Sequence, residues 1–409
     1  MKIAIIGRAP IGSYTSKLVK GFSKTSADDH VIVYGAIREK RTEQYITLVE
    51  TWTQGRFPFQ IFRRLCRDKP DVVHIQHEFG MFGKPVTMSM MPILYMMLKF
   101  LRIKTVSTIH TTIFPDALSN DAMGDLLPIA SWIPKTFVEF GLHVVYGSAC
   151  RLSDAVIVHQ RSHKTKLTHY YKINAAKIEF IPHGVGQTEV IATPESLSRW
   201  RSTIGNKKAV LYFGYLSPRK GIDYLIDAFE EFSKKNPEWI LILAGGISKE
   251  FYRPYFDHIQ DTVSLRGLSH DVLMTGFVPE GDADALYRLC HIVILPYTQV
   301  VGNASACNLA IGYRKPIIAT NLSPFSEEIE DGRHGVLCQP QNSQQILGAM
   351  EKLCCDPELY MKICANLERL EASRDWQSLA NKSLRLYDAV LTGRSDRILS
   401  LTLRDSTLG

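Results

Sequence analysis

The sequence lacks several patterns that mark particular classes of protein. Its eight cysteines are dispersed and form no CxxC pair, so neither a zinc site nor a disulfide framework is predicted. No basic region precedes an apolar core in the opening MKIAIIGRAP, so we expect no secretory signal. Reduced thiols in a cytoplasmic protein are therefore the expectation.

No hydrophobic run is long enough to span a bilayer. The most apolar segment, residues 84–104, is interrupted by Pro92 and Lys99, and it falls short of the roughly 20 residues that a spanning helix needs. We interpret it as a buried helix of a domain. The alternative is a peripheral contact with the inner face of a membrane, because Lys99, Arg102 and Lys104 flank its end.

A strong imbalance of charge is also missing. The formal net charge is +7 over 409 residues, with 45% hydrophobic and 22% charged residues, which is typical of a globular protein. This modest positive charge suits phosphorylated substrates or anionic lipid, and it does not predict nucleic acid as a partner. The length predicts more than one domain.

Short runs rich in β-branched residues recur along the whole chain, separated by segments of helical length. Continuous apolar strands that alternate with helices predict an α/β fold with parallel sheets covered on both faces. The predicted strands are residues 2–7, 30–35, 71–76, 104–110, 154–159, 177–182, 209–214, 239–245, 271–277, 291–297, 315–320 and 334–339.

The alternation pauses once, in a polar segment near residues 184–207. We therefore predict two Rossmann-like, doubly wound domains at residues 1–185 and 208–375, joined by a linker at 186–207. A C-terminal helix and tail follow at 376–409.

The loops that follow the strands are the expected place for a ligand, because open parallel sheets bind ligands beyond the carboxyl ends of their strands. After strand 209–214 come Arg219, Lys220 and Gly221, and then an amphipathic helix. Two cations beside free backbone N–H groups at a helix start predict an anion site, and such a site suits a diphosphate. A solvated turn is the alternative.

Two further glycine loops follow strands. The loop after residues 291–297 has small side chains that let a ligand approach the backbone, although a tight strand–helix connection is an alternative. These small residues are Gly302, Asn303, Ala304 and Ser305. The loop that contains Gly12 lacks the GxGxxG spacing, so a dinucleotide fingerprint is not predicted there.

Histidines gather near the ends of two neighbouring predicted strands, as His74, His77 and His110, together with Glu78. A metal site is one interpretation, but His74 alternates with Ile75 and is expected to pack inside its strand. We interpret His110 as a hydrogen-bonding or polarising group of the site, with a structural histidine as the alternative.

Taken together, these segments resemble the family-4 retaining glycosyltransferases (glycosyltransferase group 1) over nearly the whole chain. The segments that follow the family's order and spacing are FGYLSPRKGIDYLIDAF, WILILAGG, VLMTGFVP, YRLCHIVILPY and RKPIIATNLSPFSEEIEDGRHGVLC. The segments similar to its acceptor-domain landmarks are PDVVHIQHEFGMFG, VSTIH and KIEFIPHGV.

The resemblance implies a fold and a reaction. The fold is GT-B, in which two Rossmann-like domains face a cleft. The reaction is a retaining, metal-independent transfer of a hexose-type sugar from a UDP-, GDP- or ADP-sugar donor to a hydroxyl of a sugar, glycan, lipid-linked or small-molecule acceptor. No cofactor is implied besides the donor, which is a substrate.

The resemblance also implies roles for individual residues. Lys220 matches the lysine that contacts the donor diphosphate, Gly12 matches the loop near that diphosphate, and His110 matches the histidine near the transferred sugar. Val278 and Pro279 fall where the family packs and hydrogen-bonds the nucleobase. The expected catalytic residues are Lys220, Arg219 and His110, and the expected acceptor-side residues are Glu78 and His110. The expected donor-binding residues are Gly12, Arg219, Lys220, Val278, Pro279, Tyr297, Gly302, Asn303, Ala304, Ser305 and Asn308.

The sequence departs from the family's pattern at two places. Tyr215 stands where the family often has an arginine, and we interpret Arg219 as the substitute. The Glu-x7-Glu motif is absent, because its positions fall near Val301 and Leu309. Neutral hydrogen bonds can come instead from Gln299, Asn303, Ser305 and Asn308.

These departures keep a second function open, that of a non-catalytic nucleotide-sugar-binding subunit of a glycosylation complex. A nicotinamide-dependent oxidoreductase is disfavoured, because neither domain has GxGxxG followed by an acidic residue at the right distance.

Overall fold

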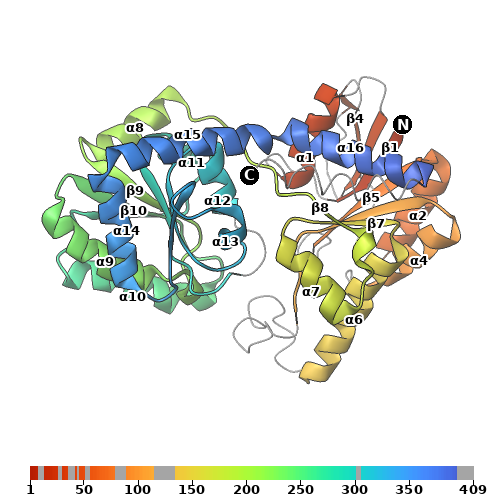
Figure 1. The fold of residues 1–409 in the computed structure, drawn as a ribbon, viewed down its shortest axis with the longest axis horizontal. Helices are drawn as coiled ribbons and strands as arrows, with labels where there is room; N and C mark the ends of the chain where they lie inside the picture. Colours follow the sequence, from red (N-terminus) through yellow and green to blue (C-terminus); the bar gives the residue numbers. More distant parts are fainter. Residues whose placement is uncertain are drawn as a thin grey trace. The chain divides into compact units, whose positions relative to one another are not determined.

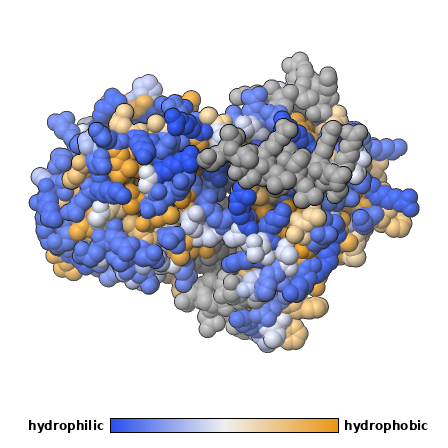
Figure 2. All heavy atoms as spheres, in the orientation of Figure 1, coloured by the Kyte–Doolittle hydropathy of each residue, from blue (hydrophilic) through white to orange (hydrophobic). Residues whose placement is uncertain are grey.

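The computed structural model of the protein describes residues 1–7, 13–25, 30–35, 42–43, 46–50, 56–78, 89–114, 134–300 and 305–393. The chain divides into two compact units (Figure 1). The first unit combines Met1–Gly184 with Trp376–Gly409, and the second unit is Val185–Asp375. On the face shown in Figure 2, hydrophilic residues cover much of each unit and hydrophobic residues lie among them.

The first unit is built on a sheet that has eight strands within the described residues, in the order β3-β4-β2-β1-β5-β6-β7-β8. All neighbouring strands are parallel except β3 and β4, which are antiparallel. From β1 the chain builds outward to one edge and then returns past β1 to build the other half, so the sheet is doubly wound. The strands are β1 (Lys2–Ile6), β2 (His30–Gly35), β3 (Thr42–Glu43), β4 (Ile46–Glu50), β5 (Val72–His77), β6 (Lys104–Ile109), β7 (Ala155–Val158) and β8 (Ile178–Phe180).

Helices cover both faces of this sheet. In β1, Ile3 and Ile5 pack against α1 and α16, whereas Ala4 and Ile6 pack into the cluster formed with α2, α4, α6 and α7. Burial on both faces explains why the strands are continuous apolar runs. Figure 1 shows the C-terminal helix α16 lying beside α1. The helices are α1 (Tyr14–Thr25), α2 (Phe57–Asp68), α4 (Met91–Phe100), α6 (Lys135–Leu152), α7 (Arg161–Tyr171), η3 (Ala175–Lys177) and α16 (Trp376–Thr392).

The most apolar segment of the sequence contributes α4. This helix has 10 residues, so it is only about 15 Å long. Met91, Leu94, Tyr95 and Leu98 are buried and form its inner face. Among the described residues, no helix combines the length and the apolar character needed to cross a membrane. Residues 84–88 of the segment lie outside the described residues.

The second unit contains a parallel sheet of six strands in the part of the chain that the structure describes, in the order β11-β10-β9-β12-β13-β14. This sheet is also doubly wound, which confirms the predicted fold class. The strands are β9 (Lys208–Phe213), β10 (Trp239–Ala244), β11 (Val272–Gly276), β12 (Ile292–Leu295), β13 (Ile317–Thr320) and β14 (Gly335–Cys338). The helices are α8 (Pro194–Ile204), η4 (Pro218–Lys220), α9 (Ile222–Lys235), η5 (Glu250–Tyr252), α10 (Arg253–Leu265), α11 (Glu280–Leu289), α12 (Ser305–Gly312), α13 (Phe325–Glu328), α14 (Ser343–Cys355) and α15 (Pro357–Ser373).

Residues 186–207, which the sequence suggested as a linker, contain α8 and belong to the second unit. The segment is held by Asp284, whose carboxylate accepts a hydrogen bond from the backbone N–H of Ala192 at 2.9 Å and one from Arg288 at 2.6 Å. These hydrogen bonds lower the pKa of Asp284, although its burial acts in the opposite direction. The paired, buried carboxylate therefore fastens this segment to α11.

Candidate functional site

The turn between β9 and α9 is locally fixed by a glycine. Gly221 has a φ of +67°, and a Cβ atom at this position would lie 2.0 Å from the carbonyl oxygen of Pro296. The carbonyl of Arg219 accepts hydrogen bonds from the backbone N–H groups of Thr298 at 2.9 Å and Gln299 at 3.3 Å. Since β9 and β12 are neighbours, these bonds join the two strand-end loops into one surface.

Lys220 lies over an aromatic ring in this surface. Its ammonium nitrogen is 3.5 Å from the ring centroid of Tyr297, a cation–π contact. Tyr297 is buried, its carbonyl accepts from the hydroxyl of Thr320 at 2.8 Å, and its ring meets Phe325 edge-on at 5.1 Å. Burial raises the pKa of Tyr297, so the phenol stays neutral. Lys220 is thus a half-buried cation on a rigid support.

The other predicted donor-binding residues lie at nearby strand ends of the same sheet. Ser305 is the exposed first residue of α12, and Asn308 is buried one turn later. Val278 and Pro279 follow β11, where Val278 is buried and Pro279 is the exposed residue before α11. Gly12, Gly302, Asn303 and Ala304 lie outside the described residues. Of the predicted residues, Lys220 contacts Tyr297 directly, and the Arg219 carbonyl bonds the next residue, Thr298.

Glycines and exposed aromatic side chains occupy the carboxyl ends of β9, β10 and β11. Gly245 needs to be glycine, because its φ is +156° and a Cβ atom would lie 1.9 Å from the carbonyl oxygen of Gly214. Tyr215 is 50% exposed and Phe277 is 74% exposed beside these glycines. The family often has an arginine at the position of Tyr215. In this chain the edge of the surface therefore carries an aromatic ring instead of a cation. Sequence reasoning did not identify Phe277.

In the first unit, His110 follows β6 and belongs to a buried polar group. Its Nε2 lies 2.6 Å from Oε1 of Gln76 in β5. The ring of His74 bonds Thr108 at 2.7 Å through Nε2 and the hydroxyl of Tyr387 at 2.6 Å through Nδ1. The expectation that His74 packs inside its strand is confirmed, because its side chain is fully buried.

The histidines of β5 do not form a metal site. His74 faces Tyr387 of α16, whereas Nδ1 of His77 lies 3.3 Å from the hydroxyl of Tyr95 of α4, on the opposite face of the sheet. Across the described ranges, no group of three or more histidine, cysteine, aspartate or glutamate side chains could hold a metal ion. Burial raises the pKa of Glu78, which ends the same strand segment.

Burial makes these histidines neutral. Loss of hydration lowers the pKa of His74 to about 3 and that of His77 to about 4. Burial, reinforced by neighbouring imidazoles, also places the pKa of His110 well below its ordinary value. The pKa of His159 is lowered in the same way and for the same reasons. At neutral pH each ring therefore carries a single proton and offers one donor and one acceptor.

Two more histidines, which sequence reasoning missed, lie at strand ends beside His110. His159 follows β7 and His183 follows β8, and both rings pack around Tyr14 of α1, with centroid distances of 5.0 and 5.2 Å. Tyr14 also contacts His110 at 4.6 Å and Trp376 at 5.2 Å. The signal was present, because His159 directly follows β7, as His110 follows β6, and His183 comes three residues after the end of β8.

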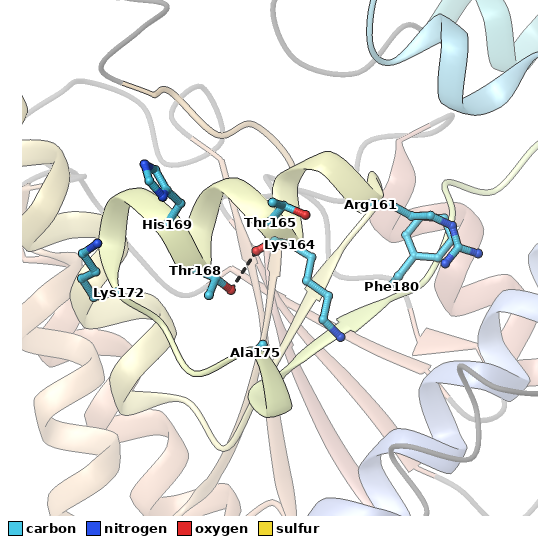
Figure 3. A pocket seen from close by; sticks show the side chains of 8 residues that line it. All are labelled: Arg161, Lys164, Thr165, Thr168, His169, Lys172, Ala175 and Phe180. Atoms are coloured by element: carbon cyan, nitrogen blue, oxygen red, sulfur yellow. Dashed lines mark hydrogen bonds between the residues drawn. The ribbon is translucent and has the colours of Figure 1, made fainter.

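A separate basic groove of about 650 Å³ runs along α7 in the first unit (Figure 3). The guanidinium of Arg161 lies 4.4 Å from the ring centroid of Phe180, and the Thr168 hydroxyl donates to the carbonyl of Lys164 at 3.0 Å. None of the predicted site residues lines the groove. Its lining residues are Arg161, Lys164, Thr165, Thr168, His169, Lys172, Ala175 and Phe180.

Comparison with known proteins gives two family matches, one in each half of the chain. The model described as Glycosyltransferase Family 4 matches residues 18–188, and the model described as Glycosyl transferases group 1 matches residues 195–369.

Two curated relatives each match somewhat less than half of the chain. The chain is 27% identical over 188 residues to α-D-kanosaminyltransferase from Streptomyces kanamyceticus, covering 46% of this chain and 46% of that protein. It is 25% identical over 191 residues to the GDP-mannose-dependent α-(1-6)-phosphatidylinositol monomannoside mannosyltransferase of Mycolicibacterium smegmatis, covering 45% and 48%. The chain thus spans about half the length of these relatives.

Solved structures share the fold along nearly the whole chain. HepE from Anabaena, in complex with UDP, aligns with a TM-score of 0.69 and 17% sequence identity, covering 95% of this chain and 100% of that chain. At this identity the likeness shows the fold. With a family match on each half and the same fold throughout, the chain belongs to the family-4 glycosyltransferases of glycosyl transferase group 1, with a GT-B fold.

Proposed function

We propose that the protein transfers a hexose-type sugar from a nucleotide-diphosphate donor to a hydroxyl acceptor, with retention of configuration. The observation that carries this proposal is the cation pair Arg219 and Lys220 at the carboxyl end of β9, held by Gly221 and by the loop after β12. The relatives support the donor class, since HepE was solved with UDP-glucose and the mannosyltransferase is named for GDP-mannose.

The charges of the turn suit the departure of a diphosphate. Breaking the bond between the sugar C1 and the phosphate oxygen leaves negative charge on the diphosphate, and Lys220 and Arg219 stabilise that charge. We propose that these cations make a metal ion unnecessary. As the new C1–oxygen bond forms on the same face, the departing phosphate takes the proton of the acceptor hydroxyl. In this mechanism His110 orients a hydroxyl and is not the base.

Thermal shift and product analysis test the proposal. UDP-, GDP- and ADP-sugars are added separately, and the matching donor is expected to raise the melting temperature because it binds the folded chain. Chromatography then detects the released nucleoside diphosphate, and its amount measures slow donor hydrolysis or sugar transfer. No shift with any of the three donor classes would contradict donor binding, and release of an inverted sugar would contradict retention.

A second candidate is a non-catalytic subunit that binds nucleotide sugars. Leu309, near the position of the family's second glutamate, is partly buried against the core of the second unit and offers no carboxylate. Its neighbour Asn308 is buried in the same helix and can offer only a neutral amide. A thermal shift with a donor, without transfer or hydrolysis across several acceptors, would favour this candidate.

For the acceptor, we propose a lipid-linked hydroxyl reached at a membrane surface. On α6, Phe137, Phe140 and Val144 are 68%, 69% and 42% exposed, and their spacing places them on one side of the helix. On α4, Phe100 is 86% exposed beside Lys99. Exposed apolar side chains near cations are typical of surfaces that lie on the boundary between lipid headgroups and acyl chains.

Vesicle sedimentation tests the membrane contact. The doubly substituted variant Phe137→Ser/Phe140→Ser is expected to bind vesicles of anionic phospholipid more weakly than the wild type, because it removes the apolar stripe. Phe251→Ser is the matched control, since Phe251 is 82% exposed but lies in the second unit. Equal binding of all three proteins would contradict the proposed contact.

A further inference from the structure

A chain of buried side-chain hydrogen bonds leads from α16 to His110 within the first unit. The Tyr387 hydroxyl lies 2.6 Å from Nδ1 of His74, and Nε2 of His74 lies 3.3 Å from Nε2 of Gln76. Oε1 of Gln76 lies 2.6 Å from Nε2 of His110. Every one of these side chains is buried, so protein groups determine which atoms carry protons.

The chemistry of the Gln76 amide sets the direction of its hydrogen bond to His110. The amide oxygen only accepts, so Nε2 of His110 carries the proton and donates it. The amide nitrogen only donates, and it faces the ring of His74, 3.3 Å from Nε2 and 3.5 Å from Nδ1. The two ring nitrogens of His74 also contact the hydroxyls of Thr108 at 2.7 Å and Tyr387 at 2.6 Å, each of which can donate or accept. The bond from Nε2 of His110 to Oε1 of Gln76 is therefore the one whose direction the amide sets.

We propose that Gln76 is a positioning residue that holds His110 as the Nε2–H tautomer and leaves Nδ1 as a hydrogen-bond acceptor. In this state His110 can receive a hydrogen bond from a sugar or acceptor hydroxyl and cannot donate one at Nδ1. This consequence for the substrate rests on the proposed function. The tautomer of His110 does not depend on that function.

Gln76 is well placed for this role because its backbone is rigid. It lies in β5, whose neighbours β1 and β6 are both paired with it, and it stands opposite Thr108 in the register. The backbone N–H of His110 extends the same pairing by donating to the carbonyl of His77 at 3.2 Å. The sheet therefore fixes the backbone of His110, and Gln76 fixes Nε2 of its imidazole.

Imidazole NMR of the full chain labelled with 15N-histidine measures the tautomer directly. In the wild type we expect a downfield, slowly exchanging proton on Nε2 of His110, assigned by its loss in His110→Asn. Gln76→Leu should lose this signal, and Gln76→Glu should keep it because a carboxylate also accepts from Nε2–H. A wild-type ring that is protonated on Nδ1 and bare on Nε2 overturns the proposal, whether or not the variants fold.

Tyr95→Phe is the matched control. It removes a buried hydroxyl from the opposite face of the same sheet, where Tyr95 contacts Ser107 at 3.0 Å and His77 at 3.3 Å. The His110 signal should persist in this variant. Its loss in both Tyr95→Phe and Gln76→Leu would indicate a general disturbance of the core and would contradict a specific role for Gln76.

Kinetics separates this inference from the proposed function. With the sugar nucleotide that gives the largest thermal shift among UDP-glucose, GDP-mannose and ADP-glucose, Gln76→Leu should lower kcat by up to about 100-fold through misplacement of His110. The KM for the donor should stay unchanged, and Gln76→Glu should recover part of the turnover. A wild type without turnover contradicts the proposed function but leaves the NMR result intact. Normal kcat in Gln76→Leu contradicts the positioning role.

Discussion

At the scale of single residues, the two cations of the β9–α9 turn differ in their surroundings. Lys220 has its ammonium group supported by the ring of Tyr297, whereas the backbone carbonyl of Arg219 fastens the neighbouring loop. A substitution at Lys220 therefore removes charge without removing the backbone hydrogen bonds that shape the turn. This makes Lys220 the cleaner test of the site.

Lys220→Ala should lower turnover by roughly 10²–10³-fold, the loss expected when one group that stabilises transition-state charge is removed. Initial rates at saturating donor measure the effect. Lys234→Ala is the matched control, because Lys234 lies on α9 but pairs with Glu230 and Glu231 at the exposed surface. Near-normal turnover in Lys220→Ala would show that Lys220 is not a catalytic residue.

Gly221→Ala should weaken donor binding and lower the melting temperature. An alanine at a φ of +67° costs about 1–2 kcal/mol, and its Cβ would in addition meet the carbonyl of Pro296 at 2.0 Å. The backbone has to shift, and Lys220 shifts with it. Gly348→Ala in α14 is the control, since nothing lies within 4 Å of a Cβ there. A donor-induced thermal shift equal to that of the wild type would show that the turn tolerates the change.

Sequence patterns predicted some site residues because they lie after strands or in the loops that follow them. His110 lies directly after β6, and Lys220 lies in the loop that follows β9; His159 directly after β7 and His183 after β8 follow the same rule but were passed over. Gln76 gave no such signal, since it lies inside a strand and its partner His110 is 34 residues away in the sequence. The bond between His74 and Tyr387 spans 313 residues, so only the fold brings its two ends together.

At the scale of elements, the contact between α1 and α16 depends on a residue without a side chain. A Cβ at Gly21 would lie 2.4 Å from the carbonyl oxygen of Trp376 and 2.9 Å from Cβ of Ala380. The two helices can therefore pack at this distance only with glycine at this place. Because α16 also carries Tyr387, the packing positions the far end of the hydrogen-bond chain to His110.

Gly21→Ala should lower the melting temperature of the first unit, although alanine favours helices over glycine by about 1 kcal/mol. The clash with the backbone of α16 outweighs this gain. Gly141→Ala in α6 is the matched control, because a Cβ there meets nothing within 4 Å and should stabilise the helix. Calorimetry of both variants measures the difference. A melting temperature raised equally by both substitutions would contradict the close packing of α1 and α16.

The elements that sequence predicted best are those buried on both faces of a sheet. The strands β2 and β9 have long apolar runs, and their predicted bounds agree with the structure within one residue. The edge strand β3, which has only two residues, and its neighbour β4 were missed. Helix α8 was missed because its mostly polar sequence resembled a linker.

At the scale of the whole molecule, the fully buried histidines are unevenly distributed over the described residues. The first unit contains His74, His77, His110 and His159, each no more than 5% exposed. In the second unit, His291 and His334 have lowered pKa values but are only partly buried. The two units should therefore respond differently to acid.

The first unit should lose stability before the second when the pH falls below about 6.5. Its buried histidines have folded-state pKa values below this unfolded value, so the unfolded state binds more protons and gains stability as the pH falls. Each such group lowers the free energy of unfolding by up to about 1.4 kcal/mol per pH unit, and for His74 the loss continues to about pH 3.

Hydrogen exchange with mass spectrometry, at about pH 7.5 and about pH 5 and corrected for intrinsic exchange rates, measures this loss in each unit. Protection in β5, β6 and β7 should fall more than protection in β9, β10 and β12. His77→Gln should reduce the difference, because it removes one buried proton acceptor, whereas His169→Gln on the exposed side of α7 should not. An equal loss of protection in both sheets would show that the buried histidines do not control the response to acid.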